Sequence, residues 1–261
     1  MKNTENIKNI FEREKIEYFS IVPVEKAEII NSYLMPDWAK NVIVFLIPYR
    51  TDRKEKEPLA HFARIRDYHC FSKELFRRLS EDFKQLFGEA NFKGYADHSP
   101  INERKLAFEC GLGDVGKNGL IINEKYGSYV FIGEIYTDID LKSYILPAQK
   151  LCTDCRECIS SCPKQDVCIS EISQKKKKTE EDFLVLQKNN VVWGCDRCQE
   201  SCPLNKNASL SPLEYFYQKK IASFKDIIFM DEKTFKNYSF SYRKRSVIEE
   251  NVENILKKHI D

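Results

Sequence analysis

The apolar and polar positions in the first part of the chain follow two different periods. Apolar residues at helical spacing predict a helix over residues 4–15. Two strands are predicted, in "EYFSIVPV" and in the continuously apolar run "NVIVFLIPY", with a helix between them in "EKAEIINSYL". A long stretch over about residues 57–86 again has its apolar residues at helical spacing, so it predicts a further helix.

Shorter elements follow before the cysteine-rich region. "NFKGYA" predicts a short strand, and residues 102–110 predict a helix that ends at Gly111. The segment "GLIINEKYGSYVFIGEIYTDI" predicts a hairpin with its turn near Tyr126 and Gly127. Because strands alternate with helices, we expect one mixed α/β (α+β) domain over residues 1–145. Residues 146–207 form a cysteine-rich segment, and residues 208–261 are charged and mostly helical in pattern.

Length and charge exclude few classes of protein. The chain has 261 residues, of which 31% are charged, and a net charge of +2, so no global field marks a nucleic-acid or membrane protein. The N-terminus is polar and lacks the features of a signal peptide. The longest apolar run is far too short to span a bilayer. We therefore expect a soluble cytoplasmic protein with no membrane partner.

The cysteines carry the strongest chemical signal. Eight of the ten lie between residues 152 and 202, and the chain shows no route to an oxidising compartment, so metal ligation is favoured over disulfides. "CTDCRECISSCP" is a C-x2-C-x2-C-x3-C-P run, which is typical of [4Fe–4S] ligation and argues strongly against the rival interpretation of structural zinc. The second motif, "CDRCQESCP", has only three cysteines, whereas two cubanes need eight thiolates.

The ligand count predicts how the cysteines are shared. In such runs the fourth cysteine serves the neighbouring cluster. One cluster is then expected to bind Cys152, Cys155, Cys158 and Cys202. The other is expected to bind Cys162, Cys195, Cys198 and, as the remaining cysteine nearby, Cys168. Cys168 alone would be interpreted as a small buried hydrophobic residue, and that interpretation is kept for Cys70 and Cys110.

Two other motifs are weak. "GLGDVGKN" satisfies G-x-G-x-x-G and nearly matches the P-loop, but Asn118 replaces the required Ser or Thr, and a helix rather than a strand precedes it. A helix C-cap followed by a tight turn explains its glycines. "DYHCFS" is similar to a D-x-H-x-x-G corrinoid box, but Ser72 replaces the glycine, so His69 is not assigned as a cobalt ligand.

Taken together, several stretches resemble one family. "ARIRDYH", "ADHSPINERKLAFECGLGDVGKNGLIINEKYGSYVFIGEI", "CTDCRECISSCP", "CIS" and "WGCDRCQESCPLN" occur in the order found in epoxyqueuosine reductases. The resemblance covers roughly residues 40–250. It implies a cobalamin-dependent iron–sulfur enzyme, related to reductive dehalogenases, that converts epoxyqueuosine in a tRNA anticodon loop to queuosine. It also implies that residues 1–145 bind cobalamin and that residues 146–207 form a ferredoxin-like two-cluster domain.

The resemblance also assigns roles to single residues. Asp97 of "ADHSP" matches the proton donor, and Cys168 of "CIS" matches the eighth cluster ligand. Residues expected to lie against the corrin are Asn118, Ile121, Ile132, Ser170 and Asp196, together with Asp97. The incomplete corrinoid box predicts base-off cobalamin without a histidine on cobalt. Alternatives stay open, since Asp97 could be a helix N-cap, Asn118 could cap a turn and Ile121 could fill a strand core.

The chain also departs from the family pattern. The loop between Cys162 and Cys168 is shortened, and the chain stops at Asp261, where "RKRSVIEENVENILKKHI" resembles the start of a helical-repeat domain that helps to grip tRNA. "KKKK" at residues 175–178 and "YRKRS" at 242–246 could contact phosphates. For "KKKK", a solvated loop balanced by the adjacent "TEED" is the alternative.

The combined prediction is a reductase with two [4Fe–4S] clusters and cobalamin that acts on epoxyqueuosine in tRNA. We expect a monomer that receives electrons from an external donor such as a flavodoxin or ferredoxin. Two alternatives stay open. One is a corrinoid iron–sulfur reductase of another small substrate, and the other is a non-catalytic two-cluster electron carrier.

Overall fold

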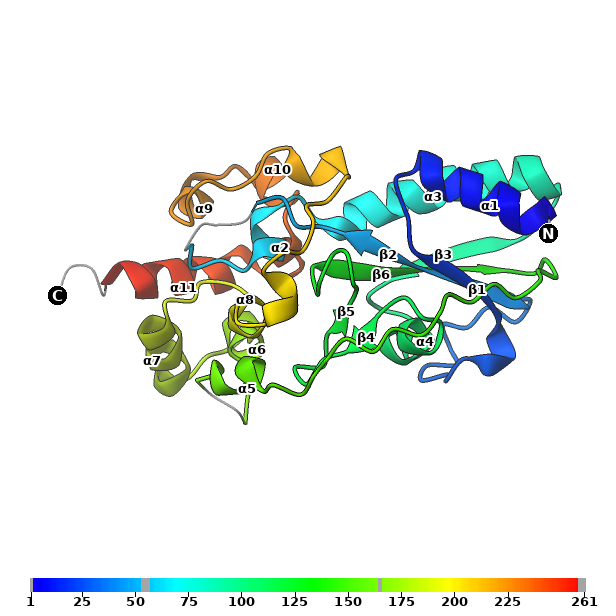
Figure 1. Ribbon diagram of the computed structural model, residues 1–261. Helices are drawn as coiled ribbons and strands as arrows, with labels where there is room; N and C mark the ends of the chain where they lie inside the picture. The colour runs from blue at the N-terminus through cyan, green and yellow to red at the C-terminus, as the bar shows by residue number, and fades with distance from the viewer. Residues whose placement is uncertain (1, 53–56, 164–165, 258–261) are drawn as a thin grey trace. The chain divides into compact units, whose positions relative to one another are not determined.

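The computed structural model describes residues 2–52, 57–163 and 166–257, which form two compact units (Figure 1). The first unit consists of Met1–Tyr49, Phe71–Cys155 and Leu204–Leu213. The second consists of Arg50–Cys70, Arg156–Pro203 and Glu214–Asp261. Each unit is thus assembled from separate stretches of chain, whereas the sequence predicted three consecutive segments, 1–145, 146–207 and 208–261. That functional division stays a prediction. Residues 258–261, the end of the predicted helical segment, lie outside the described part.

The first unit is built on a four-stranded sheet with the order β1-β2-β6-β3, and every neighbouring pair is antiparallel. Its strands are β1 (Phe19–Pro23), β2 (Asn41–Pro48), β3 (Phe92–Ala96) and β6 (Val130–Thr137). All eight residues of β2 are buried, as expected for an apolar run covered on both faces. The predicted strands at β1, β2 and β3 are confirmed, and the mixed fold is of the α+β kind because the sheet is antiparallel.

Helices cover both faces of this sheet (Figure 1). On one face lie α1 (Lys2–Arg13) and α3 (Tyr68–Phe87), where the ring of Phe11 stacks on Phe19 at 4.7 Å between centroids and meets Phe45 edge-on at 5.1 Å. On the other face lies α4 (Glu103–Glu109), whose Leu106 joins a cluster with alternate residues of the strands. The predicted helices at α1 and α4 are confirmed.

One predicted element of the first unit is confirmed only in part, and another is wrong. The hairpin predicted over residues 119–139 has its turn, where Asn123 and Gly127 form an antiparallel bridge, but its two strands do not pair with each other: β5 (Ile121–Ile122) pairs with β4 (Asp114–Val115), and β6 pairs with β2 and β3. The predicted helix in "EKAEIINSYL" is replaced by a short 3-10 turn, η1 (Val24–Lys26), and irregular backbone. There the N–H groups of Ile30 and Asn31 donate to the carbonyl of Pro100, so a distant segment takes the bonds that a helix would have made locally.

Residues Leu204–Leu213 complete the first unit after the cysteine region. The backbone N–H of Ser128 donates to Oδ1 of Asn205 at 2.8 Å, and the hydroxyl of Ser211 donates to the carbonyl of Pro48 at 2.6 Å. Gly127, with φ +57°, lies directly against the Asn205 side chain, where any Cβ would collide with it. This segment is therefore fitted closely to the sheet's own turns.

The second unit is helical, and most of its helices are short. Its elements are α2 (His61–Arg64), α5 (Glu157–Ser160), α6 (Ile169–Gln174), α7 (Glu180–Asn189), α8 (Arg197–Glu200), η2 (Pro203–Asn205, at the boundary), η3 (Glu214–Tyr217), α9 (Asp226–Phe229), α10 (Glu232–Phe235), η4 (Ser239–Tyr242) and α11 (Arg245–Lys257). The single helix predicted over residues 57–86 is wrong, because Ile65 is extended and ends α2 before α3 begins.

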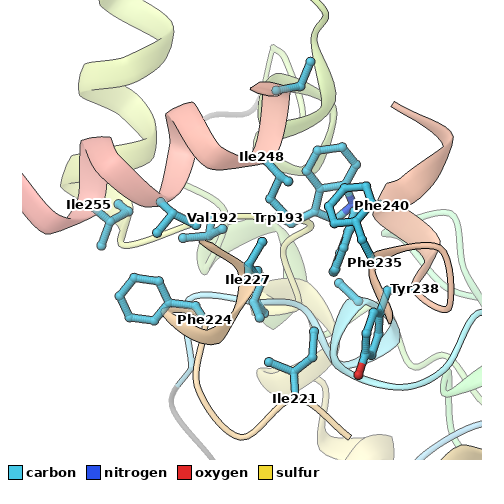
Figure 2. Packing of buried hydrophobic residues seen from close by; sticks show 14 residues of the cluster. Val192, Trp193, Ile221, Phe224, Ile227, Phe235, Tyr238, Phe240, Ile248 and Ile255 are labelled. Carbon is cyan, nitrogen blue, oxygen red and sulfur yellow. The ribbon is translucent and has the colours of Figure 1, made fainter. Parts of the chain in front are cut away.

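An aromatic and aliphatic core holds the second unit together (Figure 2). Trp193 is fully buried at its centre, with its ring packed edge-on against Phe240 at 6.2 Å between centroids. Val252 and Ile255 of α11 and Ile227 of α9 complete this core. In the described part of the chain, no helix combines the length and the apolar character needed to cross a lipid bilayer.

Candidate functional site

Asp97 lies in the loop that follows β3. Its φ is +68°, a left-handed conformation that non-glycine residues seldom adopt, and the residue is exposed. The N-cap of α4 is Asn102, whose side chain accepts from the backbone N–H of Lys105 at 3.3 Å. The capping alternative for Asp97 is therefore wrong. Asp97 therefore adopts its left-handed conformation outside the helix cap, in a region that Asp enters more readily than most residues.

Glu134 anchors this loop from the sheet. Its side chain is fully buried on β6, and its Oε2 accepts from the Ser99 hydroxyl at 2.7 Å and from the Tyr136 hydroxyl at 2.8 Å. Ser99 in turn accepts from the backbone N–H of Ile101 at 3.1 Å. A buried carboxylate on the sheet thus fixes the turn two residues after Asp97.

A second carboxylate lies beside this one. Oε1 of Glu134 and Oε2 of Glu103 are both buried, with no hydrogen-bond partner among the described residues. Burial raises the pKa of Glu103 to about 8, with further contributions from the charges of Glu134 and Asp97. Burial likewise raises the pKa of Glu134 to about 7, against the effect of its two hydrogen bonds. Three carboxyl groups therefore interact here, and the pKa values of the two glutamates are raised.

Sequence reasoning missed Glu103 and Glu134 as site residues. A signal was present, because a glutamate inside the apolar strand "VFIGEIYT" is out of place in a core. Buried carboxyl groups with raised pKa values cluster at functional sites, since acid–base chemistry needs them. The geometry can therefore keep a proton close to Asp97.

The two cysteine motifs of the second unit form matching turns. Cys158 lies in α5 and Cys198 in α8. The hydroxyls of Ser161 and Ser201, each three residues after one of these cysteines, lie 2.9 Å apart, and each donates to the carbonyl of that cysteine. The pattern repeats at the next residue, where the backbone N–H groups of Cys162 and Cys202 donate to Ile159 and Gln199. This internal pairing of equivalent turns fits the two-cluster ferredoxin pattern.

The predicted second cluster draws all its ligands from the second unit. Cys168 is exposed and directly precedes α6, and Cys195 is half-buried. Burial raises the pKa of Cys195, and the charge of Cys168 adds to this effect, so the two thiols are near each other. Of the other predicted set, Cys152 and Cys155 belong to the first unit, and Cys158 and Cys202 to the second.

The two motifs supply cysteine thiols, which bind iron–sulfur clusters and zinc alike. Within residues 2–52, 57–163 and 166–257, no three His, Cys, Asp or Glu side chains are arranged to hold one metal ion. The preference for iron–sulfur clusters therefore stays a prediction from the spacing of the cysteine run.

The residues predicted to contact the corrin lie in different settings. Oδ1 of Asn118 accepts from the backbone N–H of Leu120 at 3.2 Å, so the side chain also caps a turn. Ile121 and Ile132 are buried in the cluster beneath α4. Corrin contact by these three residues stays a prediction, and the structure gives each of them a role within the fold.

The two corrin contacts predicted in the second unit are polar. Oδ2 of Asp196 accepts from the backbone N–H of His61 at 2.5 Å, and burial raises the pKa of this carboxyl to about 7. Ser170 is half-buried near the start of α6, where its hydroxyl accepts from Gln174 at 3.0 Å. Their contact with a corrin also stays a prediction.

Three residues outside the predicted site are also described. Cys110 is buried, which raises the pKa of its thiol to about 11, as expected for an inert core residue. Cys70 is exposed on α3, so its predicted burial is wrong. His69 lies on the same helix, with Nδ1 2.8 Å from Oδ1 of Asp67, and this local ion pair agrees with leaving it unassigned to cobalt.

The basic stretches are partly used within the second unit. Lys175 pairs with Asp182 of "TEED" at 2.7 Å, which favours the balanced-loop alternative for this lysine. Lys178 donates to the carbonyl of Lys175, and burial lowers its pKa. In the second stretch, Nε of Arg243 donates to the carbonyl of Gln174. The exposed basic residues of these stretches include Lys176, Lys177 and Lys244.

Comparison with known sequences gives a consistent family. Residues 31–98 match the family model described as epoxyqueuosine reductase QueG, DUF1730. The epoxyqueuosine reductase of Leadbetterella byssophila is 30% identical over 237 residues, which cover 86% of this chain and 77% of the relative. That of Vibrio cholerae is 30% identical over 192 residues, covering 68% of this chain and 51% of the relative. The chain thus spans about half the length of several curated relatives that it matches.

Solved structures share the fold. The epoxyqueuosine reductase of Streptococcus thermophilus has a TM-score of 0.82 at 22% identity, covering 100% of this chain and 82% of that chain. An epoxyqueuosine reductase with an epoxyqueuosine-modified tRNA-Tyr stem loop has a TM-score of 0.76 at 22% identity, covering 98% and 82%. A reductive dehalogenase described with a mechanism for B12-dependent dehalogenation has a TM-score of 0.51 at 15% identity, covering 99% and 36%.

Proposed function

The chain belongs to the epoxyqueuosine reductase family of oxidoreductases, and from this premise we propose that it reduces epoxyqueuosine in tRNA to queuosine, with Asp97 as the proton donor. The cofactors proposed are two [4Fe–4S] clusters and a base-off cobalamin. The observation that carries the proposal is the Asp97 loop, in which a strained, exposed carboxyl group lies next to two buried carboxyl groups with raised pKa values.

Asp97 has the placement that a general acid needs. Removal of an epoxide oxygen requires a proton at the departing oxygen atom, and a positioned carboxylic acid can supply it. The Ser99–Glu134 hydrogen bond fixes the turn beside Asp97, so the acid is held by the sheet rather than by solvent-exposed chain alone.

One set of residues is predicted to bind the two clusters, and another set is predicted to contact the corrin. The predicted cluster ligands are Cys152, Cys155, Cys158 and Cys202 for one cluster, and Cys162, Cys168, Cys195 and Cys198 for the other. The predicted corrin contacts are Asn118, Ile121, Ile132, Ser170 and Asp196, together with Asp97. When bound, these groups supply low-potential single electrons and a strongly reducing cobalt centre. The residues' own tasks are to orient the groups, exclude water and deliver the proton.

The substrate and partners follow from the relatives. One structural neighbour was solved with an epoxyqueuosine-modified tRNA stem loop, which supports a tRNA anticodon loop as the substrate here. Exposed lysines such as Lys176 and Lys177 would contact phosphates without reading sequence. A flavodoxin or ferredoxin is the proposed electron donor, and the proposed location and state are a cytoplasmic monomer.

Substitution of Asp97 by Asn tests the proton donor. Asn keeps the size and polarity of the side chain and tolerates a positive φ, but it carries no acid. The variant is expected to fold, bind both cofactors and turn over epoxyqueuosine-containing tRNA roughly 10²–10⁴-fold more slowly, which is the usual contribution of a general acid. Single-turnover assays with reduced, cobalamin-loaded protein measure this.

Two outcomes would count against the proposal in different ways. Near wild-type turnover by Asp97→Asn would remove Asp97 from the chemistry. No turnover by the wild-type chain, despite intact clusters and retained cobalamin, would point to another small substrate. Retention of cob(II)alamin through gel filtration excludes a plain two-cluster electron carrier, and axial nitrogen splitting in its paramagnetic resonance spectrum would contradict the base-off mode.

Iron analysis tests the eighth ligand. Anaerobically prepared wild-type protein is expected to carry about eight irons per chain, from two four-iron clusters. Cys168→Ala is expected to lose one cluster, whereas Cys70→Ala, a matched change at an exposed cysteine outside both predicted sets, is expected to lose none. Full iron content in Cys168→Ala would show that another group completes that cluster.

A further inference from the structure

Asp114 connects the "GLGDVGKN" motif to the first cluster cysteine. One carboxylate oxygen, Oδ2, accepts from the backbone N–H groups of both Leu151 and Cys152, each at 2.8 Å. The other, Oδ1, accepts from the backbone N–H of Val115 at 2.8 Å. All these residues belong to the first unit. A single carboxylate therefore fixes the backbone at the point where the cysteine run begins.

Further hydrogen bonds hold the segment that precedes Cys152 against the start of the "GLGDVGKN" motif. Nε2 of Gln149 donates to the carbonyl of Gly111 at 3.1 Å, and the N–H of Leu146 donates to the carbonyl of Cys110 at 3.2 Å. Gly111 has φ +72° and lies so close to the Leu146 carbonyl that a Cβ would collide with it. The glycine that resembled a nucleotide-binding fingerprint thus serves the close approach of the cysteine segment.

In iron–sulfur proteins, backbone N–H groups near a ligand cysteine can donate hydrogen bonds to the cluster sulfurs instead. Hydrogen bonds to the cluster sulfurs stabilise the more negative, reduced cluster and raise its reduction potential, and the net charge around the cluster acts on the potential as well. Bonded to Asp114, the amides of Leu151 and Cys152 are directed toward a carboxylate. Amides engaged in this way would not be available to the sulfurs of a cluster at Cys152.

We propose that Asp114 is a positioning residue that lowers the reduction potential of the cluster bound by Cys152. It does so by fixing that cysteine's backbone, by engaging two amide donors and by placing a negative charge beside the ligand. The inference rests on the proposed iron–sulfur function. Asp114 would thereby help to hold this cluster at the low reduction potential that reduction of a corrin requires.

The test is a redox titration of the cluster-loaded chain, followed by paramagnetic resonance. Asp114→Asn keeps the shape and one acceptor oxygen but removes the charge. It is expected to retain about eight irons and to shift one of the two clusters to a more positive potential. A shift of about tenfold in the one-electron equilibrium constant, or about 59 mV, is expected. The other cluster is expected to stay unchanged.

A matched control separates this effect from a general loss of charge. Asp138 also accepts a backbone N–H, that of Asn91 at 3.0 Å, and lies in the same unit, but in the described part of the chain it bonds to no cysteine segment. Asp138→Asn is therefore expected to leave both potentials unchanged. Asp114→Ser supplies a second neutral variant, for which the same positive shift is expected, and Asp114→Glu retains the charge.

A readout without any cluster completes the test. Amide hydrogen exchange at Leu151 and Cys152 in the cluster-free chain is expected to be faster in Asp114→Ser than in the wild type. Failure of the wild type to assemble clusters would overturn the proposed function itself. Unchanged potentials in Asp114→Asn with both clusters present would overturn only this inference. Loss of the cluster in both neutral variants, with retention in Asp114→Glu, would reduce Asp114 to a structural anchor and also overturn it.

Discussion

Two buried carboxylates, one in each unit, have opposite surroundings. Asp182 in α7 has a cation, since Lys175 donates to its Oδ1 at 2.7 Å, and its Oδ2 accepts from the backbone N–H of Thr179 at 3.0 Å. Burial acts to raise its pKa, but Lys175 and the Thr179 N–H outweigh that effect, so the pKa is lowered. Among the described residues, Glu134 accepts from two neutral hydroxyls alone, and its pKa is raised to about 7.

The two carboxyl groups therefore differ in the protonation state that the fold stabilises. Asp182 completes a capping box with Thr179 and balances a lysine, so its charged form stabilises the second unit. Glu134 has no basic group among its described hydrogen-bond donors, and its charged form destabilises the first unit. A chain selected for stability alone would fill that position with an apolar residue. The fold therefore favours the neutral form of Glu134 and the charged form of Asp182.

The largest effect is expected from Glu134→Gln. The folded state binds the Glu134 proton more tightly than the unfolded chain, so its contribution is present below about pH 4.5 and lost as the pH rises through about 7. Gln is neutral at every pH and keeps an oxygen for Ser99 and Tyr136. Relative to the wild type, the free energy of unfolding of the variant is expected to rise by about 3 kcal/mol between pH 5 and pH 8.

Urea unfolding at both pH values measures this difference. Glu109→Gln, at an exposed position of α4, serves as the control and is expected to show no such trend. A difference between Glu134→Gln and the wild type that is independent of pH would mean that Glu134 is ionised in the folded chain. The contrast with Asp182 would then disappear.

Asp182→Asn is expected to act in the opposite direction and by a smaller amount. The folded pKa of Asp182 is lowered, so its contribution is present above the unfolded value of 3.8 and lost as the pH falls through the folded value. Removal of the charge leaves Lys175 without its carboxylate and weakens the capping box. A loss of about 2 kcal/mol at pH 7, shrinking at low pH, is expected in the free energy of unfolding.

Lys175→Met tests the same pair from the other side. It is expected to raise the pKa of Asp182 and to reproduce part of the loss. An unchanged stability of Asp182→Asn across the pH range would show that the ion pair contributes nothing and that both carboxylates are tolerated rather than used.

The smallest effect separates capping from catalysis in the Asp97 loop. Asn102→Ala removes the N-cap of α4 and is expected to lower the free energy of unfolding by about 1 kcal/mol. Asp97→Asn, which retains a residue type that tolerates left-handed backbone, is expected to change it by only a few tenths of that amount. Thermal unfolding of the two variants side by side decides this. A larger loss in Asp97→Asn would restore a structural role for Asp97.

Local patterns predicted the parts of the fold that local forces determine. β2 was predicted from a short, continuous apolar run rich in β-branched residues, and α1 from its regular apolar stripe. The helix in "EKAEIINSYL" failed because the N–H groups of Ile30 and Asn31 bond to Pro100. The hairpin failed because β6 pairs with two strands from distant sequence. Pairing at long range leaves no trace in short windows.

The candidate site likewise contains residues that local sequence indicates and residues whose setting depends on distant parts of the chain. The cysteine set was predicted from ligand count and spacing, and Asp97 from the resemblance of its neighbours to a family motif, and both assignments stay predictions. The carboxyl groups of Glu103 and Glu134 could not be assigned, since their raised pKa values arise from burial between a helix and a sheet. The role of Asn102 as the cap was likewise decided by backbone geometry rather than residue type.

The return of residues Leu204–Leu213 to the first unit has a consequence for biogenesis. Asn205 and Ser211 bond to Ser128 and Pro48, which precede them by 77 and 163 positions. During synthesis, the first unit therefore cannot complete its fold until every cysteine of both motifs has left the ribosome. Until then, the sheet lacks its contacts with Leu204–Leu213, while the cysteine thiols are already accessible. If the cysteines bind clusters as proposed, all of these ligands are outside the ribosome before the last folding step of the first unit, and the incomplete state before that step is exposed to chaperones and proteases.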